Sequence, residues 1–144
     1  MPKSTATCNS ILALIFNATA WADIAQNDGS GPLTDLYLSL HTASPGVGND
    51  QTINETAYTN YVRIAVERTT SGWDVPSGGA TANAALAQFA QCGVTGATIT
   101  HVAIGTASSG AGTVLYQGAL SSSLAVANGI QPQFAAGALD VTET

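Results

Sequence analysis

The chain is poor in charged side chains. Asp, Glu, Lys and Arg make up 8% of its 144 residues, against about 25% in ordinary soluble domains. Only Lys3, Arg63 and Arg68 are basic, and nine acidic residues bring the formal charge to −6. A nucleic-acid-binding face needs several Lys or Arg contacts to phosphates. The composition therefore predicts that nucleic acid is not a partner.

The chain also lacks the motifs of common catalytic and cofactor-binding sites. It contains no GxSxG elbow, HExxH, P-loop or dinucleotide fingerprint, and its acidic residues are scattered singly. The two cysteines, Cys8 and Cys92, form no CxxC motif and are expected to be free thiols. We expect no enzymatic activity, no catalytic residues and no cofactor.

The two histidines are the candidate metal ligands. His41 and His101 each lie in a predicted strand, and neighbouring strands could bring them together. A metal site would need a third ligand, for instance Asp35 or Glu67. No spacing specifies that ligand, so we expect local hydrogen bonds for each imidazole and predict no metal site.

A long hydrophobic run is also missing. Asn17 and Asp23 interrupt the most apolar segment, residues 8–25, and a membrane-spanning helix needs about 20 apolar residues. The apolar stretch 11–16 is also short for a signal peptide. We predict no membrane partner.

The same segment is predicted to be an amphipathic helix over about residues 9–25. Asn9 or Ser10 would cap its N-terminus. The helix would end before the polar, glycine-rich stretch 27–32. Its predicted buried residues are Leu14, Trp21 and Ile24, flanked by Ile11 and Phe16.

The rest of the chain reads as short strands. Leucines at 36, 38 and 40 alternate with polar residues, as in a strand with one apolar face. Ser44-Pro45-Gly46 ends that strand, and residues 44–57 form a long polar loop. A second strand is predicted at 61–68, with Val62, Ile64 and Val66 inward and Tyr61, Arg63 and Glu67 outward. Arg68 shares the inward parity, so it would lie at a solvated strand end or pair with an acid.

Later strands are predicted from β-branched residues and turns. They are residues 98–105, 113–118, a hairpin of 124–127 with 130–134 around Asn128-Gly129, and 139–142. This pattern predicts a mainly β fold, an antiparallel β-sandwich or jelly-roll-like barrel with one N-terminal helix. Length predicts one domain, residues 1–144, with the β-domain over about 33–144. The expected core is Leu36, Leu38, Leu40, Val62, Ile64, Val66, Val102 and Ile104.

Six segments, taken in order, resemble a widespread family of small tailed-phage virion proteins. Its members are often labelled tail-fibre proteins, and some are capsid decoration (cement) proteins. The segments are LALIFNATAWADIA, SGPLTDLYLSLHTASPG, NETAYTNYVRIAVERTTSGW, NAALAQF, THVAIGTASSGAGTVLYQGALSSSLAV and GIQPQFAAGALDVT. The resemblance implies a β-rich virion protein without enzymatic activity, and it places a strand at 84–90.

Three functions follow as expectations from the resemblance. The first is a capsid decoration protein on the virion surface, assembled in the host cytoplasm, which binds the major capsid protein and stabilises the head. The chain has no extended repeat or coiled-coil stalk, which favours this role. The second is a tail-fibre or receptor-binding component, and the third is a tail-associated glycan hydrolase. The weakly charged composition also predicts a homo-oligomer, a dimer or trimer. Residues 1–16 and 44–57 are the expected capsid contacts.

Overall fold

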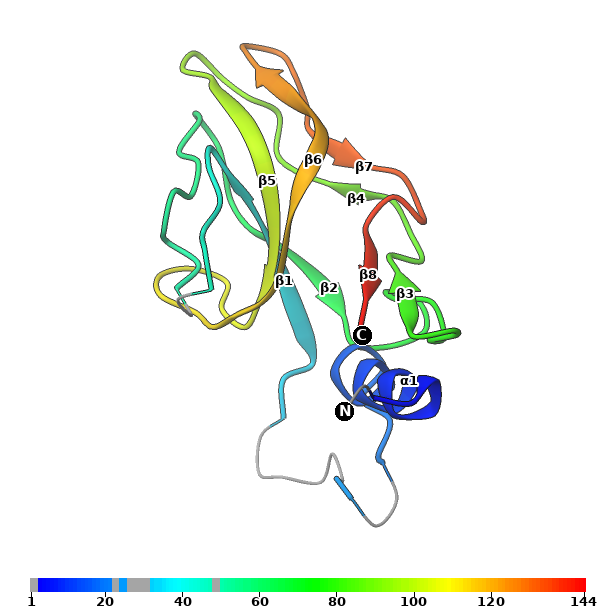
Figure 1. The fold of residues 1–144 in the computed structure, drawn as a ribbon. Coiled ribbons are helices and arrows are strands. Elements are labelled where there is room, and N and C mark those ends of the chain that lie inside the picture. The colour runs from blue at the N-terminus through cyan, green and yellow to red at the C-terminus, as the bar shows by residue number, and fades with distance from the viewer. Residues whose placement is uncertain (1–2, 22–23, 26–31, 48–49) are drawn as a thin grey trace. The chain divides into compact units, whose positions relative to one another are not determined.

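The structure, a computed structural model, describes residues 3–21, 24–25, 32–47 and 50–144. Within these residues it contains one α-helix and eight strands (Figure 1). Their bounds are α1 Thr5–Phe16, β1 Asp35–His41, β2 Ile64–Glu67, β3 Ala80–Ala82, β4 Ala87–Gln88, β5 Ala97–Gly105, β6 Val114–Val126, β7 Gln133–Phe134 and β8 Asp140–Thr142.

The chain packs as two compact units. We call residues 1–35, 66–87 and 134–144 the helix unit, and residues 36–65 and 88–133 the sheet unit. The chain passes from one unit to the other within β1, β2, β4 and β7. Each unit is described by itself.

The sheet unit is built on a four-stranded sheet with strand order β2-β1-β5-β6. β1 and β5 are antiparallel, and their register places Leu38 opposite Ile104 and Leu40 opposite Val102. Directly paired residues point to the same face of a sheet. One face of this strand pair is therefore apolar, as the alternation in the sequence predicts.

β6 is an edge strand of this sheet and is interrupted by a large irregular bulge. Ile99 pairs with Leu124, but His101 pairs with Ala119, so residues 120–123 stand opposite Thr100 alone. A bulge of this kind bends the strand and breaks the regular ladder. β6 therefore continues well beyond the predicted strand 113–118, but not as one regular strand.

The predicted core is confirmed at its centre and wrong at one position. Leu36, Leu38, Leu40 and Ile104 are buried, and Val102, Ile64 and Val66 are partly buried. Val62 is 60% exposed because β2 begins only at Ile64. The alternation assigned to residues 61–68 does not extend to 61–63, and Arg63, predicted to face outward, is buried.

In the helix unit, α1 begins and ends earlier than predicted. Its N-cap is Ser4, whose hydroxyl accepts from the Thr7 N–H, a standard way to satisfy a free helix donor. The buried stripe is Cys8, Leu12 and Phe16, spaced four residues apart. The expected range 9–25 is wrong, since Phe16 is the last helical residue, Trp21 is partly buried and Ile24 is exposed.

Arg68, expected at a solvated strand end or paired with an acid, contacts the end of α1. Its guanidinium donates to the carbonyls of Leu14 and Ile15, in the last turn of α1, and to the Leu33 carbonyl. The final carbonyls of a helix have no partner within it, and a cation there also interacts favourably with the helix dipole. Arg68 therefore caps the C-terminus of α1.

A buried asparagine organises the C-terminal part of the helix unit. The Asn83 amide donates to the carbonyls of Ala85 and Ala135, and its oxygen accepts from the Leu139 N–H, all at 2.8 Å. Near these contacts, β3 and β8 pair in antiparallel fashion. Trp73 is fully buried, and its ring meets that of Phe16 edge-on, with 4.6 Å between centroids.

The predicted hairpin of 124–127 with 130–134 is wrong, although its turn exists. The Ile130 N–H donates to the Ala127 carbonyl, and Gly129 has φ +84°. Among the described residues, the non-glycines with positive φ are Ala18, Asn54 and Asn60, so Asn128 has a negative φ. A tight hairpin of type I′ needs positive φ at both central residues, and other turns splay the strands.

The segment after this turn pairs with a different strand. β7 pairs with β4 instead of with β6. The strand expected at 84–90 is present only as β4, Ala87–Gln88.

The predicted class is confirmed: the described chain is mainly β, with antiparallel sheets and one helix near the N-terminus. The sheets formed by the described residues do not close into a barrel. The final strand, predicted at 139–142, is confirmed as β8. The described residues contain no helix long and apolar enough to span a membrane.

Replacing Leu38 with Ala should lower the free energy of unfolding by about 2–5 kcal/mol, because the fully buried side chain leaves a cavity. Val62→Ala is the matched control. It removes apolar atoms from a side chain that is 60% exposed and should change stability by less than about 0.5 kcal/mol. Urea denaturation measures both, and equal losses would contradict the assignment of Leu38 as buried and Val62 as exposed.

Replacing Asn83 with Ala should cost at least about 2 kcal/mol, because three backbone groups, among them the buried Leu139 N–H, lose their partner. Asn128→Ala is the control, since Asn128 lies in an exposed turn. Thermal unfolding of the two variants should show a lower melting temperature for Asn83→Ala only. Similar melting temperatures would show that Asn83 does not hold the C-terminal segment.

Candidate functional site

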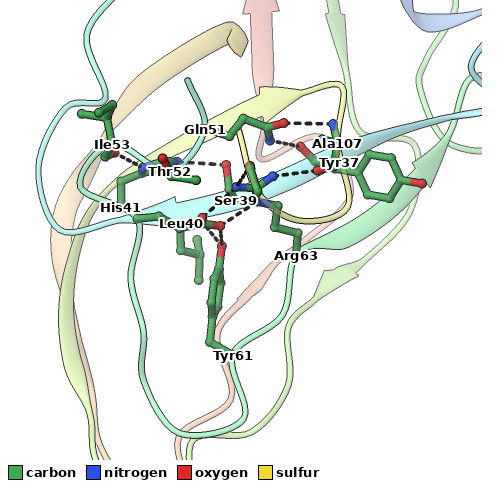
Figure 2. Close-up of polar contacts among 12 residues, drawn as sticks. Tyr37, Ser39, Leu40, His41, Gln51, Thr52, Ile53, Tyr61, Arg63 and Ala107 are labelled. Atoms are coloured by element: carbon green, nitrogen blue, oxygen red, sulfur yellow. Dashed lines mark hydrogen bonds and ion pairs between the residues drawn. The ribbon is translucent and has the colours of Figure 1, made fainter. Parts of the chain in front are cut away.

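A buried polar cluster lies on the second face of β1. Tyr37, Ser39 and His41 point to the face opposite the leucines, and both Ser39 and His41 are fully buried. Two loops of the sheet unit, residues 50–56 and 106–112, supply polar partners on this face (Figure 2). We call these two segments the roof loops.

His41 joins β1 to the first roof loop. Its Nδ1 lies 2.9 Å from the Ile53 carbonyl oxygen, and its Nε2 lies 2.9 Å from the Ser39 hydroxyl. A carbonyl can only accept, so Nδ1 carries the proton and Nε2 of the neutral ring accepts from Ser39. Burial lowers the pKa of His41 below its ordinary value of 6.5. The ring is thus held in its neutral form.

Backbone hydrogen bonds fasten the same loop to the end of β1. The Thr42 N–H donates to the Asn54 carbonyl, and the Thr56 N–H donates to the Leu40 carbonyl, both at 2.9 Å. Asn54 has φ +55°, a left-handed conformation that asparagine tolerates better than most residues. The loop therefore ends as a short extension of the sheet.

Gln51 joins the two roof loops. Its side-chain oxygen accepts from the Ala107 N–H at 3.0 Å, and its backbone N–H donates to the Gly112 carbonyl at 3.0 Å. A methyl group at Gly105 would lie 2.1 Å from the Gln51 carboxamide carbon. Only glycine at position 105 therefore leaves room for the buried amide.

Arg63 connects three segments through one guanidinium. It makes a two-pronged ion pair with the Glu55 carboxylate, with N–O distances of 2.7 Å. It also donates to the carbonyls of Ala107 and Gly110, both at 2.8 Å. Its side chain is 2% exposed, against 16% for Glu55. A desolvated guanidinium needs acceptors, and here each of its three nitrogens has at least one.

Tyr61 completes the cluster. Its hydroxyl donates to Glu55 at 2.8 Å and accepts from the Leu40 N–H at 3.1 Å. Burial is the main reason that the pKa of Tyr61 is raised far above 10. The phenol therefore serves as a neutral hydrogen-bonding group between Glu55 and the β1 backbone.

Neighbouring strands bring the two histidines together, a possibility that the sequence left open. His41 and His101 are direct partners in the β1–β5 register, and the Nδ1 of His101 lies 2.8 Å from the Thr100 hydroxyl. The proposed third ligands are engaged locally, because Asp35 accepts from Thr34 and Glu67 accepts from Thr69. In the part of the chain that the structure describes, no three His, Cys, Asp or Glu side chains are arranged to hold a metal ion.

The titratable side chains of the cluster are engaged with one another and with the backbone. Glu55 has both carboxylate oxygens bonded to Arg63, and His41 has both ring nitrogens bonded, so neither is poised to transfer a proton to a ligand. Sequence reasoning missed Gln51, Glu55 and Arg63 as a connected group. The only signals in the sequence are the glycines of 105–112 and the isolated Arg63. Neither signal identifies the partners of the arginine.

Glu55→Gln should lower the free energy of unfolding by about 3–5 kcal/mol, because it leaves the buried Arg63 guanidinium without its counter-charge. Glu67→Gln is the control at an exposed acidic position and should cost less than about 0.5 kcal/mol. Denaturant melts at neutral pH compare the two, and equal stabilities would show that the ion pair does not hold the roof loops.

Comparison with known proteins adds the family. Residues 2–142 match a family model described as podophage GP4 fiber I protein gp80. No curated protein matches the chain. The match spans almost the whole sequence and agrees with the resemblance to small tailed-phage virion proteins labelled tail-fibre proteins. The chain therefore belongs to the podophage GP4 fiber I protein gp80 family, a family of phage virion structural proteins.

Proposed function

We propose that this protein is a non-enzymatic structural component of a podophage tail fibre. The observation that carries the proposal is the family match over residues 2–142, whose description names a fibre protein. The polar cluster supports it, because the buried charged side chains bind backbone and one another. A residue committed to such contacts stabilises loops and has no free group for catalysis.

Within a fibre, the chain would act as a tip or adaptor. A fibre shaft is usually a repeat array or a coiled coil. The sequence has no such repeat, and the one helix in the described residues is 12 residues long. A small β module with loops fastened by hydrogen bonds suits the presentation of a fixed surface to a host receptor or to a neighbouring fibre protein.

Capsid decoration is the second candidate, favoured by exposed apolar side chains on the long loop 44–57. Val47 is 96% exposed and Ile53 is 46% exposed. Contact with the major capsid protein would bury these residues, whereas Gln51 and Thr56 of the same loop are already buried in the sheet unit. Such a contact would need about 1,000 Å² or more of buried area in total.

In either position we propose a homo-oligomer, because a surface with few charges opposes self-association weakly. Light scattering of the purified protein at micromolar concentration should give a mass two or three times that of the 14.4 kDa chain. A monomer in solution, together with no contact between copies on the virion, would refute this part of the proposal.

Localisation on the particle separates the two roles. In a fibre role, gold-labelled antibody or cryo-electron microscopy should place the protein on the tail, in a few tens of copies or fewer. Particles lacking it should adsorb poorly to host cells but keep their DNA on heating. Mock-depleted particles carried through the same preparation are the control.

The opposite pattern would favour decoration. Hundreds of copies on the head, with normal adsorption and early release of DNA on heating, would overturn the fibre proposal. Many weak contacts acting together could produce that stabilisation.

A further inference from the structure

The buried imidazole of His41 is unusual in its position between a strand and a loop. Its ring is fully buried, with Ser39 of β1 on one nitrogen and the Ile53 carbonyl of the roof loop on the other (Figure 2). The stability role of the cluster does not require a titratable group here. An asparagine could donate to the same carbonyl without taking up a proton near neutral pH.

We propose that His41 makes the two roof loops an acid-sensitive lid, which stays closed at neutral pH and opens when the ring takes up a proton. The opening would expose the polar face of β1 while the leucine face of the sheet remains packed. This device is independent of the proposed virion role, since it would operate on the head or on the tail.

Protonation disfavours the closed lid for physical reasons that the surroundings make explicit. Desolvation is the largest cause of the lowered pKa of His41. The Ile53 carbonyl and Glu55, both from the first roof loop, favour the charged ring, whereas Arg63 and His101 disfavour it, and desolvation outweighs the favourable contacts. Glu55 is already paired with Arg63, so its carboxylate is not free to move to the imidazolium.

The direction of the pH effect follows from this lowered pKa. A ring exposed by opening of the lid would titrate near 6.5, whereas the buried ring titrates below that value. The open form therefore binds more protons, and opening becomes more favourable as pH falls through about 6.5. The effect levels off once the pH is below the pKa of the buried ring.

The two loops should open together, because they share contacts. Gln51 bonds to Ala107 and Gly112, and Arg63 holds Glu55 of one loop and the carbonyls of Ala107 and Gly110 of the other. The β1–β5 ladder does not depend on these bonds, since its register runs through residues 37–41 and 101–105. Local opening is therefore separable from unfolding of the sheet.

Hydrogen exchange of the full chain tests the proposal. Exchange is followed by mass spectrometry between about pH 7.5 and about pH 5 and corrected for the intrinsic rate at each pH. Peptides covering 50–56 and 106–112 should lose protection on acidification, by up to about tenfold per pH unit. Peptides within 99–104 should keep theirs. His41→Asn should remove this pH dependence, and His101→Asn, on the paired strand, should retain it.

A direct titration makes the test independent of the variants. In the wild-type protein, the NMR signal of the His41 ring should titrate below pH 6.5 and in step with the loss of roof protection. Three results would overturn the proposal: unchanged roof protection at low pH, equal acceleration in 99–104, or a His41 ring that titrates at or above 6.5. If His41→Asn does not fold, the wild-type titration and exchange data decide alone.

Discussion

The sheet unit depends on how one buried guanidinium is satisfied. The Arg63 side chain is buried away from solvent, and an unpaired charge in that position would lower the stability of the fold by several kcal/mol. It donates four hydrogen bonds, which reach both oxygens of Glu55 and two carbonyls of the second roof loop. The positions of both loops are therefore set by the requirement to give each nitrogen of this group an acceptor.

Backbone carbonyls and amides are the common partners in both units. Arg68 caps α1, Asn83 holds the C-terminal segment, and Gln51 bridges the roof loops, all mainly through contacts to main-chain groups. These side chains supply the hydrogen bonds that short strands cannot supply to long loops. A chain with few charges and many loops thus gains order from a small number of well-placed polar residues.

The parts of the fold that sequence alone could predict are those with a strong repeat. Alternation predicts β1 and β-branched residues predict β5, but neither specifies the register that pairs His41 with His101. The predicted start of α1 is wrong, although Ser4 is a favoured N-cap residue and the spacing of Cys8, Leu12 and Phe16 indicates the buried face. Arg63 was misplaced because no periodicity extends into the irregular residues before β2. Its partners lie in two loops, and loop contacts have no period to read.

The bulge in β6 has a consequence for solubility. Residues 118–126 read almost the same in both directions, Gly-Ala-Leu-Ser-Ser-Ser-Leu-Ala-Val, and contain no charge or proline. As a regular edge strand, this segment would be a template for a second copy aligned about Ser122, a recognised route to aggregation. Across the bulge, Ala119 and Ala125 are six residues apart, but their partners His101 and Thr98 are three apart. At equivalent positions, the N–H and C=O groups of one half point to the open edge of the sheet, whereas those of the other half point to β5. A second copy of the segment therefore cannot pair with both halves in one continuous ladder.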